Sequence, residues 1–192
     1  PTHPDILGPY WSENHPQRSI LDTAVKFLNE YFSAMHDVIE WHDGQIINYI
    51  GDSVMVVFGT PKKLDDHQLL SVRCVIQMRK KLTKLNKKWD KNEFSRYWKN
   101  HEIDSITART GIHTGSVIAG NIGSDRMLQY STIGDTVNVA SRLEQRNKDF
   151  STDILFSHEI YTALTKKLYD KANYEGEISL KGRDTKTKVY SI

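Results

Sequence analysis

The sequence has one cysteine, no long apolar run and almost no net charge, and each shortage excludes a class of protein. Cys74 alone cannot form a disulfide within the chain, and its place on the expected buried face of a helix favours a packing role in a reducing compartment. Because 26 basic residues nearly balance 24 acidic ones, the net charge of +2 predicts neither nucleic acid nor an anionic membrane as a partner.

No segment approaches the roughly 18 to 20 apolar residues that cross a bilayer, and no charged-then-apolar leader opens the chain. The chain begins at Pro1 rather than methionine, which suggests a segment of a longer protein. We therefore expect a cytoplasmic domain, with any regulatory or membrane domain lying upstream of it. With 192 residues and 38% apolar content, we expect one domain over residues 1–192.

The first element is predicted from its hydrophobic spacing. Apolar residues recur at alternating intervals of four and three, as on one stripe of an amphipathic helix, at Leu21, Val25, Leu28, Phe32, Met35 and Ile39. The helix should end near His42-Asp43-Gly44, with Gly44 in the left-handed conformation that closes a helix.

A tight hairpin is predicted next. Two short runs, Ile46–Ile50 and Ser53–Phe58, are separated only by Gly51-Asp52, which is typical of a two-residue turn. Asp52 is then fixed at the hairpin tip by two hydrogen-bonded strands. A carboxylate in that position is rigid enough to hold a metal.

The rest of the chain alternates helices with strands. Asp65-Asp66 can cap a second helix, and Thr107–His113 with Ser116–Ala119 resembles a second hairpin turning at Thr114-Gly115. The remaining expected elements are helices at 136–148 and 158–168 and strands at 153–156, 174–180 and 188–192. This mixture argues for an α+β sheet covered by helices on one face.

The segment 79–99 is strongly basic, with interleaved aromatic residues. Its members are Arg79, Lys80, Lys81, Lys84, Lys87, Lys88, Lys91, Arg96 and Lys99, with Trp89, Phe94, Tyr97 and Trp98 among them. Such a stretch could bind a nucleic-acid backbone. The alternative is a solvated helix end whose aromatics dock on the domain, and we favour it, with no nucleic-acid partner, because no binding fold accompanies the charge.

Three motifs carry more information than composition does. They are Tyr49–Gly59 with its acidic turn, Gly111–Gly115 running into Gly120–Ser124, and Tyr130–Glu144. In this order they resemble the catalytic domain of class III adenylyl and guanylyl cyclases of the bacterial type, from about Leu21 to the end of the chain. The resemblance implies a ferredoxin-like βαββαβ core sheet.

Asn138 and Arg142 are the strongest catalytic candidates. They are four residues apart, so on a helix they project from the same face and can address one ligand. An arginine can meet a phosphate with its planar donor fork, and an asparagine can hydrogen-bond a ribose oxygen. The alternative is that Asn138 caps the helix and Arg142 pairs with a surface acid, but Asp135 and Thr136 are already available as caps.

The resemblance implies a metal site with two Mg²⁺ or Mn²⁺ ions held by two aspartates. Asp52 matches the aspartate at the hairpin tip. Asp5, in Asp5-Ile6-Leu7-Gly8, matches the other one faintly, because Pro1-Thr2-His3-Pro4 cannot be the expected apolar strand. The first strand is therefore missing or diverged. Lys181 matches the triphosphate-binding lysine of the family.

In this resemblance, Asn48 and Ser131 occupy the positions that recognise the purine. Neither residue selects one base decisively, since an amide and a hydroxyl both donate and accept. We favour ATP, converted to 3′,5′-cyclic AMP and pyrophosphate, because neither position holds an acidic residue that could accept hydrogen bonds from the N–H groups of guanine. A guanylyl cyclase acting on GTP and an inactive cyclase-homology domain that dimerises as a regulatory module remain alternatives. The family also implies a homodimer with composite sites.

Overall fold

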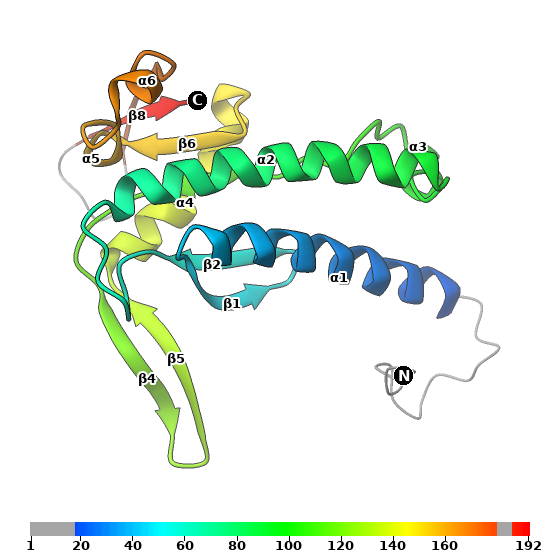
Figure 1. The fold of residues 1–192 in the computed structure, drawn as a ribbon, viewed down its shortest axis with the longest axis horizontal. Coiled ribbons are helices and arrows are strands. Elements are labelled where there is room, and N and C mark those ends of the chain that lie inside the picture. Colours follow the sequence, from blue (N-terminus) through cyan, green and yellow to red (C-terminus); the bar gives the residue numbers. More distant parts are fainter. Residues whose placement is uncertain (1–17, 180–185) are drawn as a thin grey trace.

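The computed structural model describes residues 18–179 and 186–192. Helices and strands alternate along the chain (Figure 1). The helices are α1 (Arg18–Trp41), α2 (His67–Lys91), α3 (Arg96–Lys99), α4 (Asp135–Phe150), α5 (His158–Tyr161) and α6 (Lys166–Tyr169). The strands are β1 (Gln45–Ile50), β2 (Ser53–Val57), β3 (Thr110–Ile112), β4 (Ile118–Ser124), β5 (Met127–Ile133), β6 (Ile154–Ser157), β7 (Asn173–Ile178) and β8 (Thr187–Ser191).

Helix α1 confirms the amphipathic pattern, because Met35 and Ile39 are buried against α2 and the β1–β2 hairpin. The helix ends as expected near residue 42, but the residue in the left-handed region is Asp43, with φ of 57°, and not Gly44. Gly44 is needed for another reason. A Cβ there would come within 2.8 Å of Cγ2 of Ile39 and 2.9 Å of the ring of Phe58.

The first hairpin is confirmed. Strands β1 and β2 pair antiparallel from Gln45–Val57 to Ile50–Ser53, so Gly51 and Asp52 form the two-residue turn. Gly51 has φ of 61°, a conformation that glycine adopts at little cost. The pairing register shifts between Ile46 and Asn48, which makes Ile47 a bulge residue.

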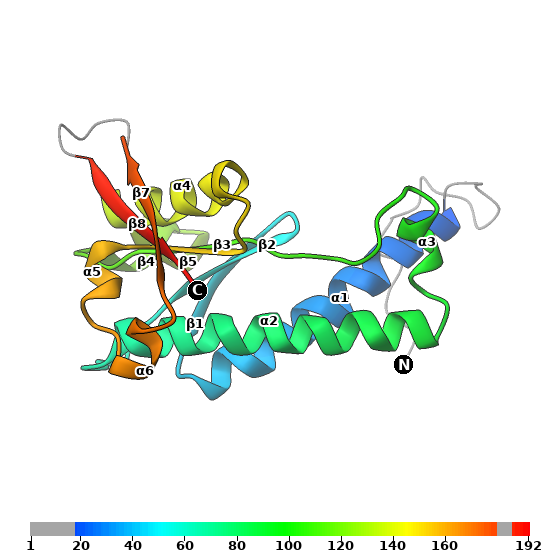
Figure 2. The same cartoon turned by 90° about the horizontal axis from the view of Figure 1, so that it is seen from above.

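A four-stranded sheet in the order β3-β6-β8-β7 forms the centre of the C-terminal half. Alternate residues of β6 face opposite layers, as a strand requires. Phe156 packs with Val72 and Val75 of α2, whereas Leu155 packs with Leu143 of α4. Figure 2 shows β3 and β6 between the two helices. The α+β class is confirmed, but the helices cover both faces of this sheet and not one.

The second predicted hairpin is wrong. Thr110–Ile112 pairs in parallel with β6, so it is an edge strand of the four-stranded sheet. The hairpin is formed instead by β4 and β5, which pair antiparallel from Ile118–Ile133 to Ser124–Met127. It projects from the body as a long arm (Figure 1). The expected helix over 158–168 is divided into the short helices α5 and α6.

The aromatic residues of the basic segment 79–99 dock on the domain, as we favoured. Trp89 is 1% exposed and its indole Nε1 donates a hydrogen bond of 2.9 Å to Glu30 on α1. Trp98 packs against Trp89 and Phe27, with ring centroids 5.5 Å and 5.6 Å away. Within residues 18–179 and 186–192, no helix has the length and apolarity that a membrane span requires.

Candidate functional site

Helix α4 presents Asn138 and Arg142 one turn apart. The helix begins at Asp135, directly after its N-cap residue Gly134, so Asn138 lies inside the helix and does not cap it. Thr136 does not cap it either, because its hydroxyl donates to the carbonyl of Ser116 at 2.8 Å. Asn138 is exposed and Arg142 half-buried. Both side chains can therefore reach a ligand from one helix face.

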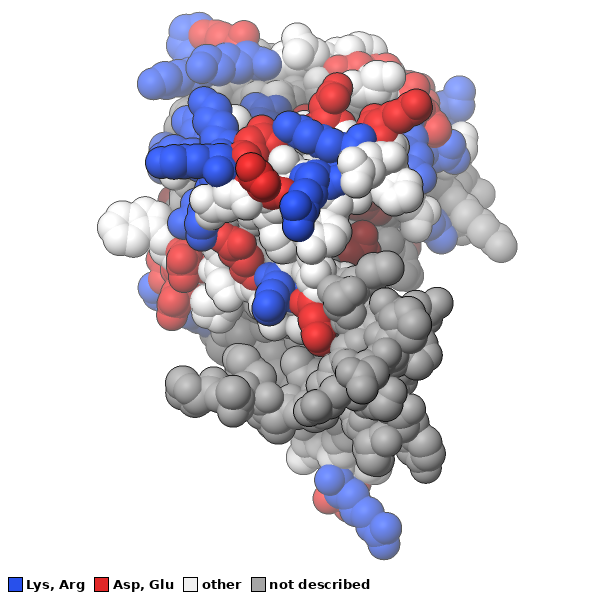
Figure 3. All heavy atoms as spheres, turned by 90° about the vertical axis from the view of Figure 1, so that its right-hand side faces the viewer, with Lys and Arg blue, Asp and Glu red and all other residues white. Residues whose placement is uncertain are grey.

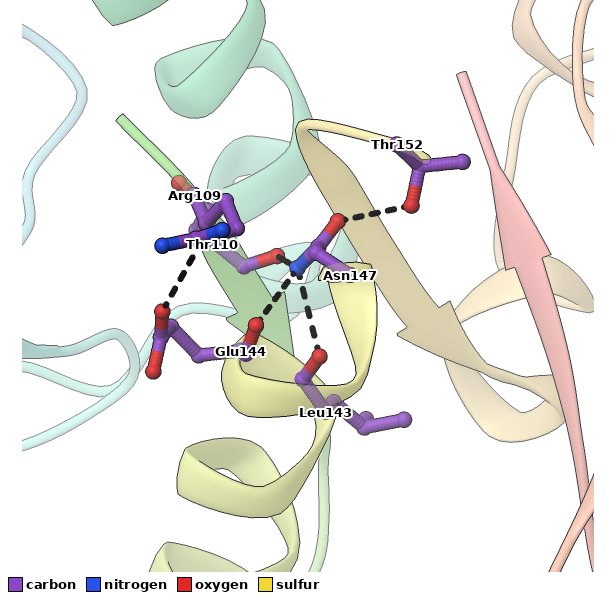
Figure 4. A network of polar contacts seen from close by, with 6 residues as sticks. All are labelled: Arg109, Thr110, Leu143, Glu144, Asn147 and Thr152. Atoms are coloured by element: carbon purple, nitrogen blue, oxygen red, sulfur yellow. Dashed lines mark hydrogen bonds and ion pairs between the residues drawn. The ribbon is translucent and has the colours of Figure 1, made fainter. Parts of the chain in front are cut away.

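A buried asparagine anchors the second half of α4 (Figure 4). The amide of Asn147, which is 0% exposed, donates to the carbonyl of Thr110 on β3 at 3.0 Å and to carbonyls within its own helix. Its carbonyl oxygen accepts a hydrogen bond of 2.9 Å from Thr152. Arg109 and Glu144 form an ion pair of 3.8 Å beside this network. Helix α4 is thus fixed in rotation and height against β3.

Asn48 and Ser131 lie on neighbouring strands. Strand β5 lies beside β1, where Nε2 of Gln129 donates a hydrogen bond of 3.4 Å to the carbonyl of Ile47. Asn48 directly follows that bulge residue, and Ser131 lies two residues beyond Gln129, on the same side of β5. The two purine-site candidates therefore both lie next to the hydrogen bond between Gln129 and Ile47. We did not identify Gln129 from the sequence, because its partner is a backbone carbonyl 82 residues away.

Two further contacts fix the base of the β4–β5 arm. The hydroxyl of Tyr130 lies 2.9 Å from Oγ1 of Thr60, in the segment that follows β2. Nε2 of His67, at the start of α2, lies 3.1 Å from Oγ1 of Thr114. The arm is consequently attached to the segment that follows the β1–β2 hairpin, and the segment before the arm is attached to the start of α2.

Asp52 lies exposed at the tip of the β1–β2 hairpin. Burial, and after it the negative charge of Asp52, raises the pKa of Tyr31 on α1. Mg²⁺ and Mn²⁺ bind carboxylates well. Within the described part of the chain, the carboxylate of Asp52 forms no hydrogen bond or ion pair. Within that part, no three histidine, cysteine or acidic side chains gather to form a complete metal site. Asp52 therefore fits a metal ion that takes its other ligands elsewhere.

Two of the predicted site residues, Asp5 and Lys181, lie outside the described residues. The structure therefore places five of the seven candidates. Asn48 and Ser131 lie on the neighbouring strands β1 and β5, Asn138 and Arg142 lie on α4, and Asp52 lies in the turn between β1 and β2.

The profile of the adenylate and guanylate cyclase catalytic domain matches residues 10–192. The chain belongs to this family. Over 173 residues, 89% of its length, it is 33% identical to adenylate cyclase 1 of Rhizobium meliloti (strain 1021). It spans about a quarter of that relative, 24% of its length.

Solved cyclase structures share the fold. The guanylyl cyclase Cya2 is similar with a TM-score of 0.72 and 28% identity, covering 89% of this chain and 80% of its own. The adenylyl cyclase CyaB from P. aeruginosa is similar with a TM-score of 0.67 and 29% identity, covering 93% of this chain and 84% of its own. The nucleotidyl cyclase relationship is therefore clear, whereas these similar proteins include both adenylyl and guanylyl cyclases.

Proposed function

We propose that this domain converts ATP to 3′,5′-cyclic AMP and pyrophosphate. The observation that carries the proposal is the placement of Asn138 and Arg142 on one face of α4, in a chain of the cyclase family. In the reaction the 3′-oxygen of the ribose loses its proton and forms a bond to the α-phosphorus. The bond from that phosphorus to the oxygen bridging to the β-phosphate breaks, and pyrophosphate leaves.

Asn138 and Arg142 serve the step at the α-phosphorus. A carboxamide can hold a ribose oxygen, so Asn138 orients the sugar for in-line attack. A guanidinium offers a planar set of donors to phosphate oxygens, so Arg142 stabilises the charge that builds there as the bonds change. Because Asn147 fixes α4 against β3, both side chains start from a preorganised position.

Asp52 provides a carboxylate for the metal ions of the reaction. Bound Mg²⁺ or Mn²⁺, two per site, supplies acidification of the 3′-hydroxyl and neutralisation of the triphosphate. Asp5 and Lys181 complete this part of the proposal as the second metal ligand and the triphosphate lysine.

A homodimer with shared sites accounts for the exposed apolar surface of the arm. Ile118 and Met127 are 74% and 73% exposed, and Ile133 pairs directly with Ile118. Opposite residues of an antiparallel pair share a face, and that face also holds Ser131, two residues from Ile133. An apolar face continuous with the purine subsite fits a second copy of this chain, so each site combines Asp52 of one protomer with Asn138 and Arg142 of its partner.

The surroundings of Asn48 support ATP as the substrate. Met55 lies opposite Asn48 on β2, and the nearby side chains of Gln129 and Ser131 on β5 are uncharged. The N1–H and amino groups of guanine are donors, for which a carboxylate is a strong acceptor. Adenine offers one donor and one acceptor on the same edge, which an amide and a hydroxyl can match.

The decisive experiment is incubation of the purified chain with ATP or GTP in the presence of Mn²⁺, followed by chromatography of the products. We expect cyclic AMP and pyrophosphate, with a smaller yield of cyclic GMP. A larger yield from GTP would identify a guanylyl cyclase, which the neutral Asn48 also permits. If neither nucleotide were turned over by the dimer, the domain would be a dimerising regulatory module.

A further inference from the structure

Helix α2 carries a straight line of basic side chains that the proposed reaction does not use. The residues are Arg73, Lys80, Lys84, Lys87 and Lys91, and all are exposed. Their spacings of seven, four, three and four keep them on one face of the helix. At about 1.5 Å per residue the line is about 27 Å long. We call it the α2 stripe.

The α2 stripe lies opposite the buried face of the helix. Val72, Val75, Leu82, Leu85 and Trp89 form the buried face, and they alternate with the stripe along the helix. The stripe therefore points away from both the sheet and α1. In the single chain it is an outer surface of the domain.

The stripe also differs from the other basic residues of the segment 79–99. Lys81, Lys88 and Lys99 form ion pairs with Asp37, Glu30 and Asp90, at 4.0 Å for the first pair and 2.7 Å for the last. Basic and acidic side chains are accordingly interspersed at the end of the molecule seen in Figure 3. Within residues 18–179 and 186–192, no acidic side chain pairs with any member of the stripe.

The chemistry of the stripe restricts its partner to an anionic surface. Four of its five members are lysines, which act as flexible point charges, whereas specific phosphate recognition favours the planar fork of arginine. Of the aromatic side chains that could stack on nucleic-acid bases, Trp89 is buried, Phe94 and Trp98 are half-buried, and the 44% exposed Tyr97 lies on α3 and not on α2. A protein interface needs an apolar centre, and the stripe contains no apolar residue. A plane of lipid phosphates requires neither stacking nor an apolar centre.

We propose that the α2 stripe binds the surface of a bilayer that contains anionic phospholipids. Each lysine or arginine near such a surface contributes a similar small amount, so binding is the sum of several weak contacts. The contact is electrostatic and lies on the surface, since no member of the stripe can enter the hydrocarbon. It orients the domain with α2 against the membrane and leaves the β4–β5 arm free. This inference does not depend on the proposed cyclase activity.

The test is sedimentation of the purified chain with vesicles of phosphatidylcholine alone and of phosphatidylcholine with 30% phosphatidylserine. We expect binding only to the anionic vesicles, weakening steeply as salt is raised, because surface contacts are screened. Replacing Lys80, Lys84, Lys87 and Lys91 with glutamine should weaken it on the order of a thousandfold. Glutamine and lysine have similar helix propensities, so circular dichroism should be unchanged.

The matched control neutralises four exposed lysines on other elements, Lys148, Lys167, Lys171 and Lys188, with the same change in net charge. If this control lost as much binding as the stripe variant, binding would follow net charge and the proposal would be wrong. Absence of binding to the anionic vesicles at low salt would also overturn it. So would stripe-dependent binding to duplex DNA that is tighter than binding to the vesicles.

Discussion

Gly111 of β3 lies against Ala140 of α4 so closely that a Cβ on Gly111 would come within 2.1 Å of the Ala140 carbonyl oxygen. Ala140 stands midway between Asn138 and Arg142, so the strand supports α4 directly behind the two proposed catalytic side chains. Five residues after Arg142, Asn147 adds its hydrogen bond to Thr110. A backbone contact and a buried amide together set the position of the catalytic face.

Removing that amide should destabilise the domain. In Asn147→Ala the carbonyl of Thr110 and the hydroxyl of Thr152 lose a buried partner, and we expect the free energy of unfolding to fall by about 2 to 3 kcal/mol. Urea unfolding followed by circular dichroism measures this. Arg146→Ala is the matched control, since its bond to Asp149 is exposed and should contribute less than about 1 kcal/mol. Equal losses in the two variants would show that Asn147 does not anchor the helix.

Asp52→Ala should abolish metal-dependent turnover and leave the fold intact. The side chain is exposed at a turn, so its removal costs little packing, whereas a metal ion loses a carboxylate ligand. The measurement is product formation against Mn²⁺ concentration, with thermal unfolding as a check. Asp65→Ala, which removes another exposed loop carboxylate, should keep full activity. An active Asp52→Ala enzyme would refute the proposed metal site, whatever its dimer affinity.

The pattern of the sequence was sufficient for elements whose pairing or packing is local. The period of α1, the two-residue turn at Asp52 and the spacing of Asn138 and Arg142 are all decided within a few residues. The arm was missed because residues of β4 and β5 are exposed, contain Gly120 and Gly123, and show no alternation of apolar and polar side chains. Strand β3 was assigned to a hairpin because parallel pairing with β6 joins segments about 40 residues apart.

The same distinction applies to the site. Asp52, Ser131, Asn138 and Arg142 were proposed from motifs that are continuous in the sequence, and Asn48 from its position directly before the first of them. Gln129 and Asn147 were not, since their roles depend on backbone carbonyls of other elements. Every residue has a backbone carbonyl, so the residue type does not indicate which carbonyl accepts such a hydrogen bond. Position in the fold, and not residue type, reveals both.

Cys74 should be protected from thiol reagents in the folded domain. Burial raises the pKa of its thiol to about 12, from an ordinary value near 9.0, so the reactive thiolate is scarce at pH 8. We expect alkylation only at the rate of unfolding. The pKa of Cys74 is higher in the folded than in the unfolded state, so the neutral thiol favours folding. Its contribution to the free energy of unfolding is complete below about pH 9 and is lost as the pH rises toward 12. Rapid labelling at pH 8 without denaturant would contradict the buried assignment.

Ile118→Lys should weaken the dimer and lower activity without unfolding the protomer. Ile118 is 74% exposed in the single chain, so a charge there costs little until a partner covers it. We expect at least tenfold weaker dimerisation by sedimentation velocity, with specific activity falling on dilution at higher concentrations than in the parent. Ile103→Lys, at an apolar residue that is 47% exposed outside the arm, is the control and should change neither. Identical dimer affinities in the two variants would exclude the arm as the interface.

The composite site predicts that two inactive variants can restore each other. Asn138→Ala and Arg142→Ala should each lower kcat by about ten- to a thousandfold with a smaller change in KM, because their contacts strengthen in the transition state. Each proposed site takes Asp52 from one protomer and Arg142 from its partner. A heterodimer of Asp52→Ala and Arg142→Ala chains therefore has one site with both residues intact. After random exchange of equal amounts, half of the dimers are mixed and each has one working site, so about a quarter of the parent activity should return. Subunit exchange is followed independently with two fluorescent labels. A mixture that exchanges fully yet stays as inactive as either variant would show that one chain holds the whole site.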